Sequence, residues 1–299
     1  MPSEGRRAVI EGSPIACVAL VTPFDEQGEV DEAAFARLIA WHEANGMDGI
    51  VVAGTNGEGP SLTGPEKRDL CALACSVRGS LKVIAGLGTC SIKEATWLAR
   101  RAYEAGCDAL LALPPFYFRN ASARGIRAFF DALLRESPLP VIAYNHPITG
   151  VDLSPEILAD LASEHENLMG VKDSSGDYDR FLEYRRRLPG KLALVGDETL
   201  LLKSLQDGGN GTISGLANSL PHLVARQVRE QNPALQRLID EACAGLKAHP
   251  APAVHKFVLS ELGLPGGYLR PPLEPLNETQ QSAVRDFLSS FEARPSLSA

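Results

Sequence analysis

The sequence lacks the features that mark membrane-embedded, secreted and nucleic-acid-binding proteins. No apolar run approaches the roughly 20 residues of a membrane-spanning helix. Residues 1–13 carry charges where a signal peptide would have an apolar stretch. The net charge is −8. The only notable basic run, residues 185–187, is interpreted as the solvated end of a helix. We therefore expect a cytoplasmic protein with neither nucleic acid nor a membrane as its partner.

Signals for metal binding and for serine hydrolysis are also absent. The six histidines show no metal-ligand spacing, and the six cysteines form no paired framework. Most of the cysteines adjoin Ala, Leu or Val, which is typical of reduced, buried thiols. No Gly-x-Ser-x-Gly motif is present. The sequence thus offers no support for a metal-dependent reaction or for a serine hydrolase.

What the sequence does contain is a regular series of short apolar runs. Its 44% apolar and 22% charged residues are typical of a globular protein with a sizeable core. Runs rich in Val, Ile, Leu and Ala predict eight strands, at residues 15–20, 49–52, 81–85, 109–113, 140–144, 168–171, 192–195 and 211–214. Helical segments separate them, with capping boxes expected at residues 63–66 and 91–94 and an N-cap before proline at residues 154–155.

The strand pattern predicts the fold class. Strands that are continuous apolar runs are typical of parallel sheets covered on both faces. Eight of them alternating with helices over about 200 residues predict a (β/α)8 barrel, the TIM barrel. A doubly wound open sheet is the alternative, but it usually has fewer strands and a phosphate-binding glycine motif after the first one. The first strand leads into residues 22–25, Thr-Pro-Phe-Asp, which form no such motif, so we favour the barrel.

Strand signals stop near residue 230. We predict a catalytic barrel domain over residues 14–230 and a helical extension over residues 231–299 that packs on the barrel. Helices of the extension are expected at residues 231–248, 252–262 and 278–291. The tail from Arg294 onward is expected to fray.

Lys172 is the strongest candidate for chemistry. Apolar residues precede it, and a polar turn that contains glycine follows at once. In a TIM barrel the catalytic groups lie at the C-terminal ends of the strands, which is where Lys172 falls. A lysine held there among apolar walls can lose its charge, and a neutral amine attacks ketones. The ordinary alternative is a solvated or ion-paired lysine.

Other strand ends offer weaker candidates. The glycines of residues 54–59 could expose backbone N–H groups to a carboxylate, although most such stretches are simple turns. Tyr144 could donate and accept protons or be a hydrogen-bonded core residue. The aromatic residues at 116–118 could pack or form a subunit contact. Residues 208–215, which contain four glycines, lie near the strand where such barrels often hold phosphate.

Taken together, these strand ends resemble the dihydrodipicolinate synthase/N-acetylneuraminate lyase family of pyruvate-dependent class I aldolases. The resemblance covers nearly the whole chain, from residues 21–24 to residues 270–273. The motifs that agree in order and spacing are Gly-Thr-Asn-Gly-Glu at 54–58, the loop around Tyr117, Tyr-Asn-x-Pro at 144–147 and Gly-Val-Lys-Asp at 170–173. Residues 59–62 and 270–272 are similar to 2-keto-3-deoxygluconate aldolases, and Thr-Asn-Gly-Glu is similar to 4-hydroxy-2-oxoglutarate aldolases.

The resemblance implies roles for particular residues. Lys172 corresponds to the family's Schiff-base lysine and Tyr144 to its proton-transferring tyrosine. Thr55 corresponds to the hydroxyl residue of a proton relay, and Tyr117 to a relay tyrosine that a neighbouring subunit commonly supplies. The substrate-binding positions are Thr55, Asn56, Ile213 and Ser174. The resemblance also implies a homotetramer built from dimers, and no cofactor, because the protonated imine serves as the electron sink.

Departures from the family's motifs bear on the substrate. Dihydrodipicolinate synthases usually carry an arginine shortly after Tyr-Asn-x-Pro, whereas this chain has the shorter Ile-Thr-Gly at residues 148–150. N-acetylneuraminate lyases typically lack the Asp-Ser pair found at residues 173–174. We therefore expect cleavage of a 2-keto-3-deoxy sugar acid or a 4-hydroxy-2-oxo acid to pyruvate and an aldehyde. The alternatives through the same imine are a 4-hydroxy-tetrahydrodipicolinate synthase and a keto-deoxy-acid dehydratase.

Two further alternatives belong to other functional classes. A phosphate-binding barrel isomerase would use Gly208, Gly209 and Gly211 with an acid–base carboxylate, and Lys172 would be dispensable. A non-catalytic 2-oxo-acid-binding protein would hold its ligand in the same pocket without forming a covalent adduct.

Overall fold

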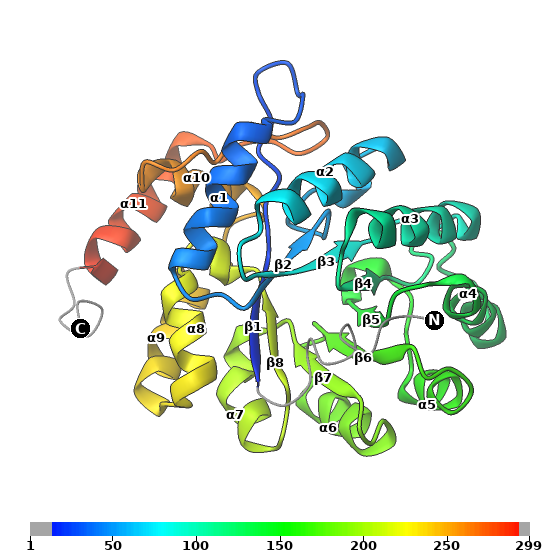
Figure 1. Cartoon of the computed structure of the whole chain (residues 1–299). Helices are drawn as coiled ribbons and strands as arrows, with labels where there is room; N and C mark the ends of the chain where they lie inside the picture. Colours follow the sequence, from blue (N-terminus) through cyan, green and yellow to red (C-terminus); the bar gives the residue numbers. More distant parts are fainter. Residues whose placement is uncertain (1–13, 293–299) are drawn as a thin grey trace.

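The structure is a computed structural model that describes residues 14–292, and it contains a closed barrel of parallel strands (Figure 1). Each strand pairs with the next one in sequence order, and β8 pairs with β1 to close the barrel. The strands are β1 (Ile15–Ala19), β2 (Gly49–Val52), β3 (Lys82–Gly86), β4 (Ala109–Ala112), β5 (Val141–Asn145), β6 (Leu168–Asp173), β7 (Leu192–Val195) and β8 (Gly211–Ser214). All eight predicted strands are present, with ends that differ by at most two residues.

Helices on the outside alternate with the strands, which confirms the predicted TIM barrel (Figure 1). They are α1 (Glu32–Ala44), α2 (Gly64–Val77), α3 (Ile92–Ala105), α4 (Ala123–Glu136), α5 (Pro155–Glu164), α6 (Tyr178–Arg187), α7 (Leu201–Gln206) and α8 (Pro221–Glu230). Short 3-10 turns follow four of the strands: η2 (Gly59–Ser61), η3 (Pro147–Thr149), η4 (Glu198–Leu200) and η5 (Leu216–Asn218).

Two of the three predicted helix starts have the expected caps. The capping box at Thr63 and Glu66 is complete, and Ser154 caps α5 ahead of a proline in its first turn. The box predicted at residues 91–94 is only half formed. Ser91 accepts a bond from the Glu94 backbone, but the Glu94 carboxylate is bound to the Thr89 hydroxyl instead of the Ser91 N–H. The Thr89 hydroxyl donates to the Glu94 carboxylate in place of the Ser91 N–H, which donates to Thr89 instead.

The apolar side chains form two clusters on opposite sides of the barrel wall. Successive residues of a strand point to opposite faces, so most strands contribute to both clusters. The inner cluster fills the barrel and includes Cys17, Val51, Ile84, Ile142 and Leu194. The outer cluster joins the strands to the surrounding helices. The barrel interior is therefore a packed core, and open space is expected only where the strands end.

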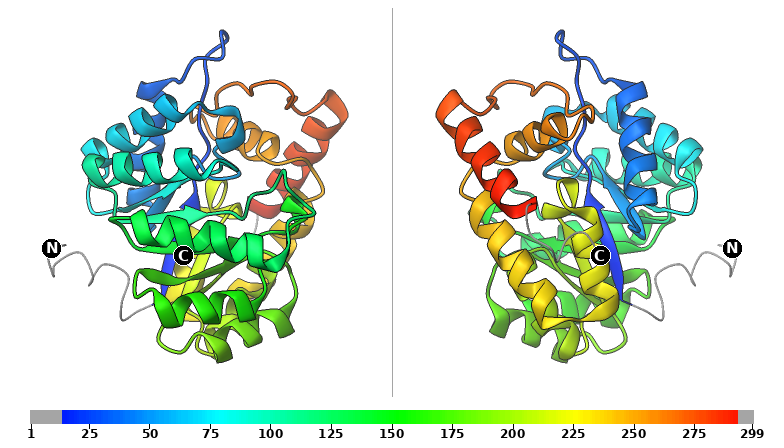
Figure 2. Two further views of the ribbon diagram at one scale, coloured as in Figure 1. Left: turned by 90° about the vertical axis from the view of Figure 1, so that its right-hand side faces the viewer. Right: turned by 90° about the vertical axis from the view of Figure 1, so that its left-hand side faces the viewer.

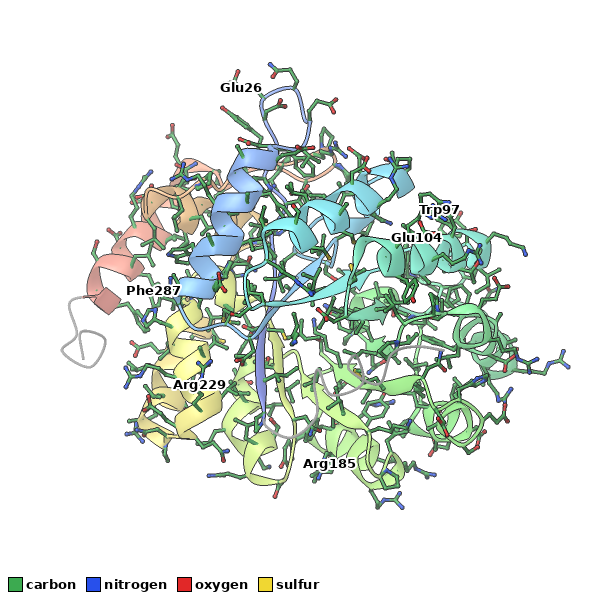
Figure 3. The ribbon with its side chains drawn as sticks, viewed as in Figure 1. Glu26, Trp97, Glu104, Arg185, Arg229 and Phe287 are labelled. Carbon is green, nitrogen blue, oxygen red and sulfur yellow. The ribbon has the colours of Figure 1, made fainter. Side chains whose placement is uncertain are left out.

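The chain after the barrel forms α9 (Pro233–Leu246), α10 (Ala253–Glu261) and α11 (Glu278–Glu292), as predicted. Helix α11 packs on α9 and α10 (Figure 2). Gly245 of α9 allows this close approach, because a Cβ there would lie 2.5 Å from the ring of Phe287 (labelled in Figure 3). The division into two domains at residue 230 stays a prediction, and the tail from Arg294 lies outside the described residues.

Polar residues immediately before β2, β4 and β8 brace the N-terminal end of the barrel. Asp48 accepts a hydrogen bond from the Ala16 N–H at 2.8 Å, and Asp108 accepts one from the Val83 N–H at 2.8 Å. Asn210, before β8, accepts in the same way from β7. Each bond ties the start of one strand to the strand before it. This end of a TIM barrel ordinarily serves stability, and the opposite end serves function.

None of the described helices is both long and apolar enough to cross a membrane, and the expected cytoplasmic location stays a prediction. The six cysteines are unpaired, as expected, although Cys75 and Cys90 are only half-buried.

His42 on α1 is an unusual core residue. It is fully buried, and neither ring nitrogen has a hydrogen-bond partner within residues 14–292. Burial lowers the pKa of this histidine to about 3. Between its ordinary value near 6.5 and this lowered value, the unfolded chain binds a proton that the folded chain does not. The contribution of His42 therefore lowers the free energy of unfolding as the pH falls from about 6.5 toward the lowered pKa.

We predict that His42→Leu makes the protein less sensitive to acid. Between about pH 8 and about pH 5, the wild type should lose roughly 2 kcal/mol more of its free energy of unfolding than the variant does. Urea unfolding of both proteins at the two pH values measures the difference. An equal loss in both would show that His42 protonation is not coupled to folding.

Candidate active site

Lys172 and Tyr144 lie side by side at the C-terminal ends of β6 and β5. The two strands pair with Tyr144 opposite Lys172, so both side chains point to the same face of the barrel wall. Each is 4% exposed. The Lys172 Nζ atom lies 4.0 Å from the centroid of the Tyr144 ring. The register thus brings an amine and a phenol together at the end where barrel enzymes carry their chemistry.

The next residues of the two strands, Asn145 and Asp173, point outward, and a hydrogen bond between them links the strands. The Asn145 amide donates to the Asp173 carboxylate at 2.7 Å, and the Ser175 hydroxyl donates to the same carboxylate at 2.7 Å. Burial raises the pKa of the Asp173 carboxyl, although these hydrogen bonds oppose the rise. Because Asp173 follows Lys172 directly, its fixed position also fixes the direction of the lysine side chain.

Small residues make room for the amine. A Cβ at Gly196, after β7, would lie 1.9 Å from the Ser174 hydroxyl and 2.8 Å from the Cε atom of Lys172. In the part of the chain that the structure describes, the Nζ atom has no ion-pair or hydrogen-bond partner. It lies instead at the wall of a cavity of about 340 Å³, a volume within the usual range of roughly 300–1,000 Å³ for ligand pockets.

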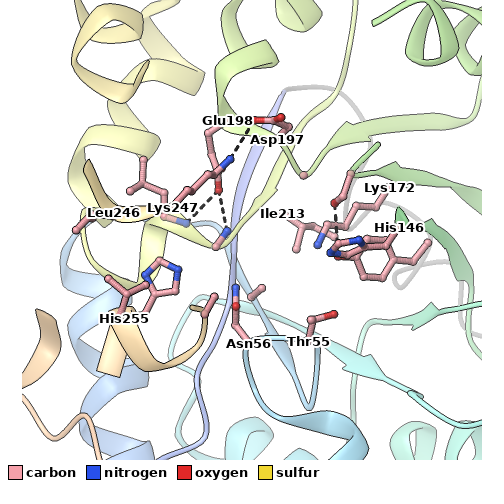
Figure 4. Close-up of a pocket in the computed structure, with 18 of the residues that line it drawn as sticks. Thr55, Asn56, His146, Lys172, Asp197, Glu198, Ile213, Leu246, Lys247 and His255 are labelled. Carbon is pink, nitrogen blue, oxygen red and sulfur yellow. Dashed lines mark hydrogen bonds and ion pairs between the residues drawn. The ribbon is translucent and has the colours of Figure 1, made fainter. Parts of the chain in front are cut away.

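The cavity has two ends, which Figure 4 shows on opposite sides. Lys172 and His146 lie at one end, and Leu246, Lys247 and His255 lie at the other (Figure 4). Ile213 of β8 lies between them and is fully buried. Thr55 and Asn56 come from the loop after β2 and close a third side (Figure 4).

Thr55 and Asn56 carry free polar groups into the cavity. Over residues 14–292, neither side chain has a hydrogen-bond partner. The Asn56 amide packs over Gly215, where a Cβ would lie 2.8 Å from its nitrogen. A hydroxyl and an amide without partners at a cavity wall are suited to a bound carboxylate.

A buried ion pair holds this loop. Glu58 has a left-handed backbone, with φ at 54°. Its carboxylate accepts from Lys256 Nζ of α10 at 2.6 Å, and both side chains are almost completely buried. Lys256 also donates to the Tyr268 carbonyl, and the Arg270 N–H donates to Glu58 at 3.1 Å. The loop that carries Thr55 and Asn56 is therefore anchored to the segment after the barrel.

Ser174 also belongs to the site, two residues after Lys172. Its hydroxyl donates to the Tyr144 hydroxyl at 3.4 Å. The predicted relay partner Thr55 lines the same cavity, but no hydrogen bond joins it to Tyr144 within the described chain. Within the described residues, the hydroxyl that is hydrogen-bonded to the phenol is that of Ser174.

Tyr117 lies apart from the other predicted residues. Its side chain is 80% exposed, and it does not line the cavity of its own chain. It packs edge-on against Phe118, and its backbone N–H donates to the Cys90 sulfur at 3.3 Å. The structure thus brings together six of the seven predicted residues and leaves Tyr117 on the surface.

Several residues that line the cavity are not among those predicted from the sequence. The Glu198 carboxylate is buried and accepts from the Ser214 hydroxyl at 2.7 Å and from Lys247 at 2.8 Å. Burial alone would raise the pKa of Glu198, but Lys247 and the hydrogen bonds hold it at about 2. His255 of α10 shares a hydrogen bond with the Ser219 hydroxyl at 2.9 Å, and burial lowers its pKa to about 4.

The position of each missed residue explains why it was missed. Glu198 lies shortly after the end of β7, a position that is itself a sequence signal for a site residue in a barrel. His146 lies two residues after Tyr144, and the two-residue period of a strand places both on one face. Lys247 and His255 belong to the helical segment after the barrel, where no strand-end signal exists.

The phosphate-binding alternative loses support. Gly208 and Gly209 precede β8, so they lie at the N-terminal end of the barrel, away from the cavity and from any phosphate bound there.

One group within residues 14–292 has a metal-like arrangement, Asp131, Glu164 and His165, and it lies outside the cavity. Arg135 and Arg127 already pair with its two carboxylates.

Comparison with known proteins agrees with this geometry. The sequence pattern of the dihydrodipicolinate synthetase family matches residues 15–291. The 4-hydroxy-tetrahydrodipicolinate synthase of Bartonella henselae is 34% identical over 284 residues, which cover 91% of this chain and 96% of that protein. The dihydrodipicolinate synthase structure from Aquifex aeolicus has a TM-score of 0.89 at 33% identity and covers 93% of this chain and 98% of its own. A chloride-inhibited dihydrodipicolinate synthase from Acinetobacter baumannii, complexed with pyruvate, has a TM-score of 0.88 at 30% identity and covers 95% and 100%.

Fold and site define a barrel enzyme with a buried lysine beside a tyrosine at the ends of neighbouring strands. The chain belongs to the dihydrodipicolinate synthetase family, which confirms the resemblance inferred from the motifs. It is accordingly a carbon–carbon lyase of the class I aldolase type, from a family that uses pyruvate and an aldehyde.

We predict that Lys256→Met destabilises the protein strongly, because it leaves the Glu58 carboxylate buried without its cation. The expected loss is roughly 3–5 kcal/mol of the free energy of unfolding. Adding Glu58→Gln should restore part of that loss, since no buried charge is then unpaired. Urea unfolding of the single and double variants measures both effects.

The matched control is Arg68→Met, which breaks the exposed Arg68–Asp69 pair on α2. It should leave the unfolding midpoint nearly unchanged. Equal losses in the Lys256→Met variant and the double variant would mean that the two buried charges do not stabilise each other.

Proposed function

We propose that the protein holds pyruvate as an imine on Lys172 and joins it to, or releases it from, an aldehyde. The observation that carries the proposal is the position of Lys172. Its amine lies at the cavity wall against the Tyr144 ring, almost buried and without an ion-pair partner over residues 14–292. An amine in such surroundings can act as a nucleophile toward a ketone.

The proposed reaction proceeds through an enamine. The Lys172 nitrogen attacks C2 of pyruvate, and loss of water gives a protonated imine. The imine draws electrons from C3, so that loss of a C3 proton gives the enamine. The enamine carbon then attacks the aldehyde carbon, or the reverse step breaks that bond and regenerates the enamine. Tyr144 is the candidate proton carrier, supported by its contact with the amine and with Ser174.

We assign the carboxylate of pyruvate to Thr55 and Asn56. The assignment is supported by their free polar groups and by the anchoring of their loop through Glu58 and Lys256. Binding the carboxylate there would orient the ketone carbon toward Lys172, with Ile213 as the apolar wall between them.

The second substrate has two candidates. The names of the curated relatives favour a 4-hydroxy-tetrahydrodipicolinate synthase, in which pyruvate adds to an aldehyde that also carries a carboxylate. This reaction is better supported by those relatives than the cleavage reaction that the motif departures predict.

One observation favours cleavage of a 4-hydroxy-2-oxo acid or a 2-keto-3-deoxy sugar acid. The turn after β5 presents Ile148, which is 65% exposed, and buries Thr149 with its hydroxyl bonded to backbone carbonyls. Arg119 lies beside this turn, because a Cβ on Gly150 would lie 3.0 Å from its Cδ atom. In a synthase, Arg119 would have to take over the role of the arginine that is missing from the turn. A panel assay for pyruvate release from such acids, set against pyruvate consumption with a carboxylated aldehyde, separates the two reactions.

We also propose that Tyr117 completes the site of a neighbouring subunit in a homotetramer. Tyr117, Phe118 and Ile148 form exposed apolar surface at the mouth of the barrel, on two loops that Arg119 and Gly150 bring together. Aromatic residues are enriched at the centres of subunit interfaces. The exposure of Tyr117 and its absence from the lining of its own cavity support donation to a partner.

We predict that borohydride reduction in the presence of pyruvate labels Lys172. Mass spectrometry of peptides should find the adduct there, and Lys172→Ala should abolish both labelling and turnover while the fold persists. The matched control is Lys203→Ala, because Lys203 also lies over a tyrosine ring, that of Tyr178, but on the exterior. That variant should label like the wild type. Pyruvate that binds without labelling Lys172 would overturn the proposal and favour a non-catalytic binding protein.

We predict that two inactive variants restore activity when they assemble together. Tyr117→Phe retains Lys172, and Lys172→Ala retains Tyr117, so a mixed dimer contains one complete site. Co-expressed chains should regain up to about a quarter of the wild-type activity if subunits pair at random across a two-fold interface. Activity that stays at the level of the separate variants would mean that Tyr117 does not serve a neighbour, and an active monomer in sedimentation would mean the same.

A further inference from the structure

His146 lies one layer above Tyr144 on the same face of the barrel wall. Successive strand residues alternate, so the inward side chains after Tyr144 and Lys172 are those of His146 and Ser174. The His146 ring is half-buried, lines the cavity and lies 5.5 Å from the Tyr144 ring between centroids. Figure 4 shows it beside Lys172.

Hydrogen bonding assigns the proton of the His146 ring. The Ile148 backbone N–H donates to Nδ1 at 3.2 Å, so Nδ1 carries no proton and the neutral ring has its N–H at Nε2. Burial, and to a lesser extent the nearby Lys172, lowers the pKa of His146 to about 4. The ring is therefore neutral near neutral pH, with one donor.

That donor is unused in the structure. Over residues 14–292, no hydrogen bond involves His146 Nε2. Its neighbour in the same layer, Ser174, already donates its hydroxyl hydrogen to Tyr144. A half-buried N–H at the wall of a ligand cavity is satisfied when a ligand oxygen reaches it.

We propose that His146 Nε2–H donates a hydrogen bond to the oxygen of the aldehyde partner, which makes His146 a catalytic residue for the carbon–carbon step. This inference rests on the proposed function. In the joining direction the acceptor is the aldehyde carbonyl oxygen, and in the cleavage direction it is the hydroxyl oxygen on C4.

The position of the donor fits the course of the reaction. Pyruvate bound to Lys172, Thr55 and Asn56 would lie at the level of Tyr144 and Lys172. An aldehyde that enters from the mouth of the barrel then meets the layer above, which His146 and Ser174 form. As the bond forms, electrons move from the enamine carbon to the aldehyde carbon, the carbonyl π electrons move onto the aldehyde oxygen, and negative charge develops there. Tyr144, the proposed carrier of the C3 proton, returns that proton to the oxygen and so forms the hydroxyl. A neutral imidazole N–H held by its other nitrogen stabilises that charge without transferring its proton.

Two substitutions separate this role from the role of His146 in the turn. His146→Asn keeps an oxygen that can accept from the Ile148 N–H, as an N-cap residue does, but it is too short to bring a donor to the Nε2 position. His146→Gln carries an amide N–H at about the length of Nε2. We predict that the asparagine variant loses roughly a hundredfold in the rate of condensation with the faster of glyoxylate and glyceraldehyde. The glutamine variant should recover part of that rate.

Reactions that need no aldehyde serve as the internal control. Borohydride labelling of Lys172 and exchange of the pyruvate C3 protons in heavy water, followed by NMR, should proceed in both variants as in the wild type. Condensation at the wild-type rate in the asparagine variant would overturn the inference. A parallel loss of exchange and condensation would also overturn it, since the residue would then serve only the structure of the site. Failure of the wild type itself to label or exchange would instead contradict the proposed function.

Discussion

The pairing of β5 with β6 is the constraint on which the rest of the site depends. With Tyr144 opposite Lys172, phenol and amine enter the cavity from neighbouring strands and touch. A shift of one residue would turn Lys172 toward the helices and bring Asp173 into the barrel, because side chains alternate along a strand. Asp173, held by Asn145 and Ser175 on the outer side, opposes such a shift. The same alternation stacks the site in two layers, with His146 and Ser174 above.

Charge is distributed unevenly around the cavity, and the distribution has a chemical consequence. Two buried carboxylates are each paired with a lysine: Glu198 in the cavity wall with Lys247, and Glu58 in the loop behind Thr55 and Asn56 with Lys256. These pairs avoid the large penalty of an isolated buried charge. Lys172 is buried to a similar extent but has no carboxylate partner within residues 14–292. Within the described chain, Lys172 thus differs from Lys247 and Lys256 in having no paired carboxylate, and the missing side chain of Gly196 leaves space beside its amine.

Helices after the barrel are part of the site. Lys256 of α10 anchors the loop of Thr55 and Asn56, and Lys247 and His255 form the far wall of the cavity. The far wall holds charged and polar groups where the substrate beyond the reacting carbons would lie. In the proposed reaction, Lys172 would carry the chemistry and the far wall would contact the part of the substrate that distinguishes one aldehyde from another.

The sequence by itself determined the barrel, its eight strands and the position of Lys172 at a strand end. Apolar runs and the polar turns after them are local signals, and burial on both faces of a parallel sheet requires them. Only the tertiary structure decided which groups face the lysine. Ser174 rather than Thr55 contacts Tyr144, Tyr117 stays outside its own cavity, and Lys247 and His255 join from a distant segment. Such contacts depend on the closure of the barrel and on the packing of α9 and α10, which bring together residues that no local pattern relates.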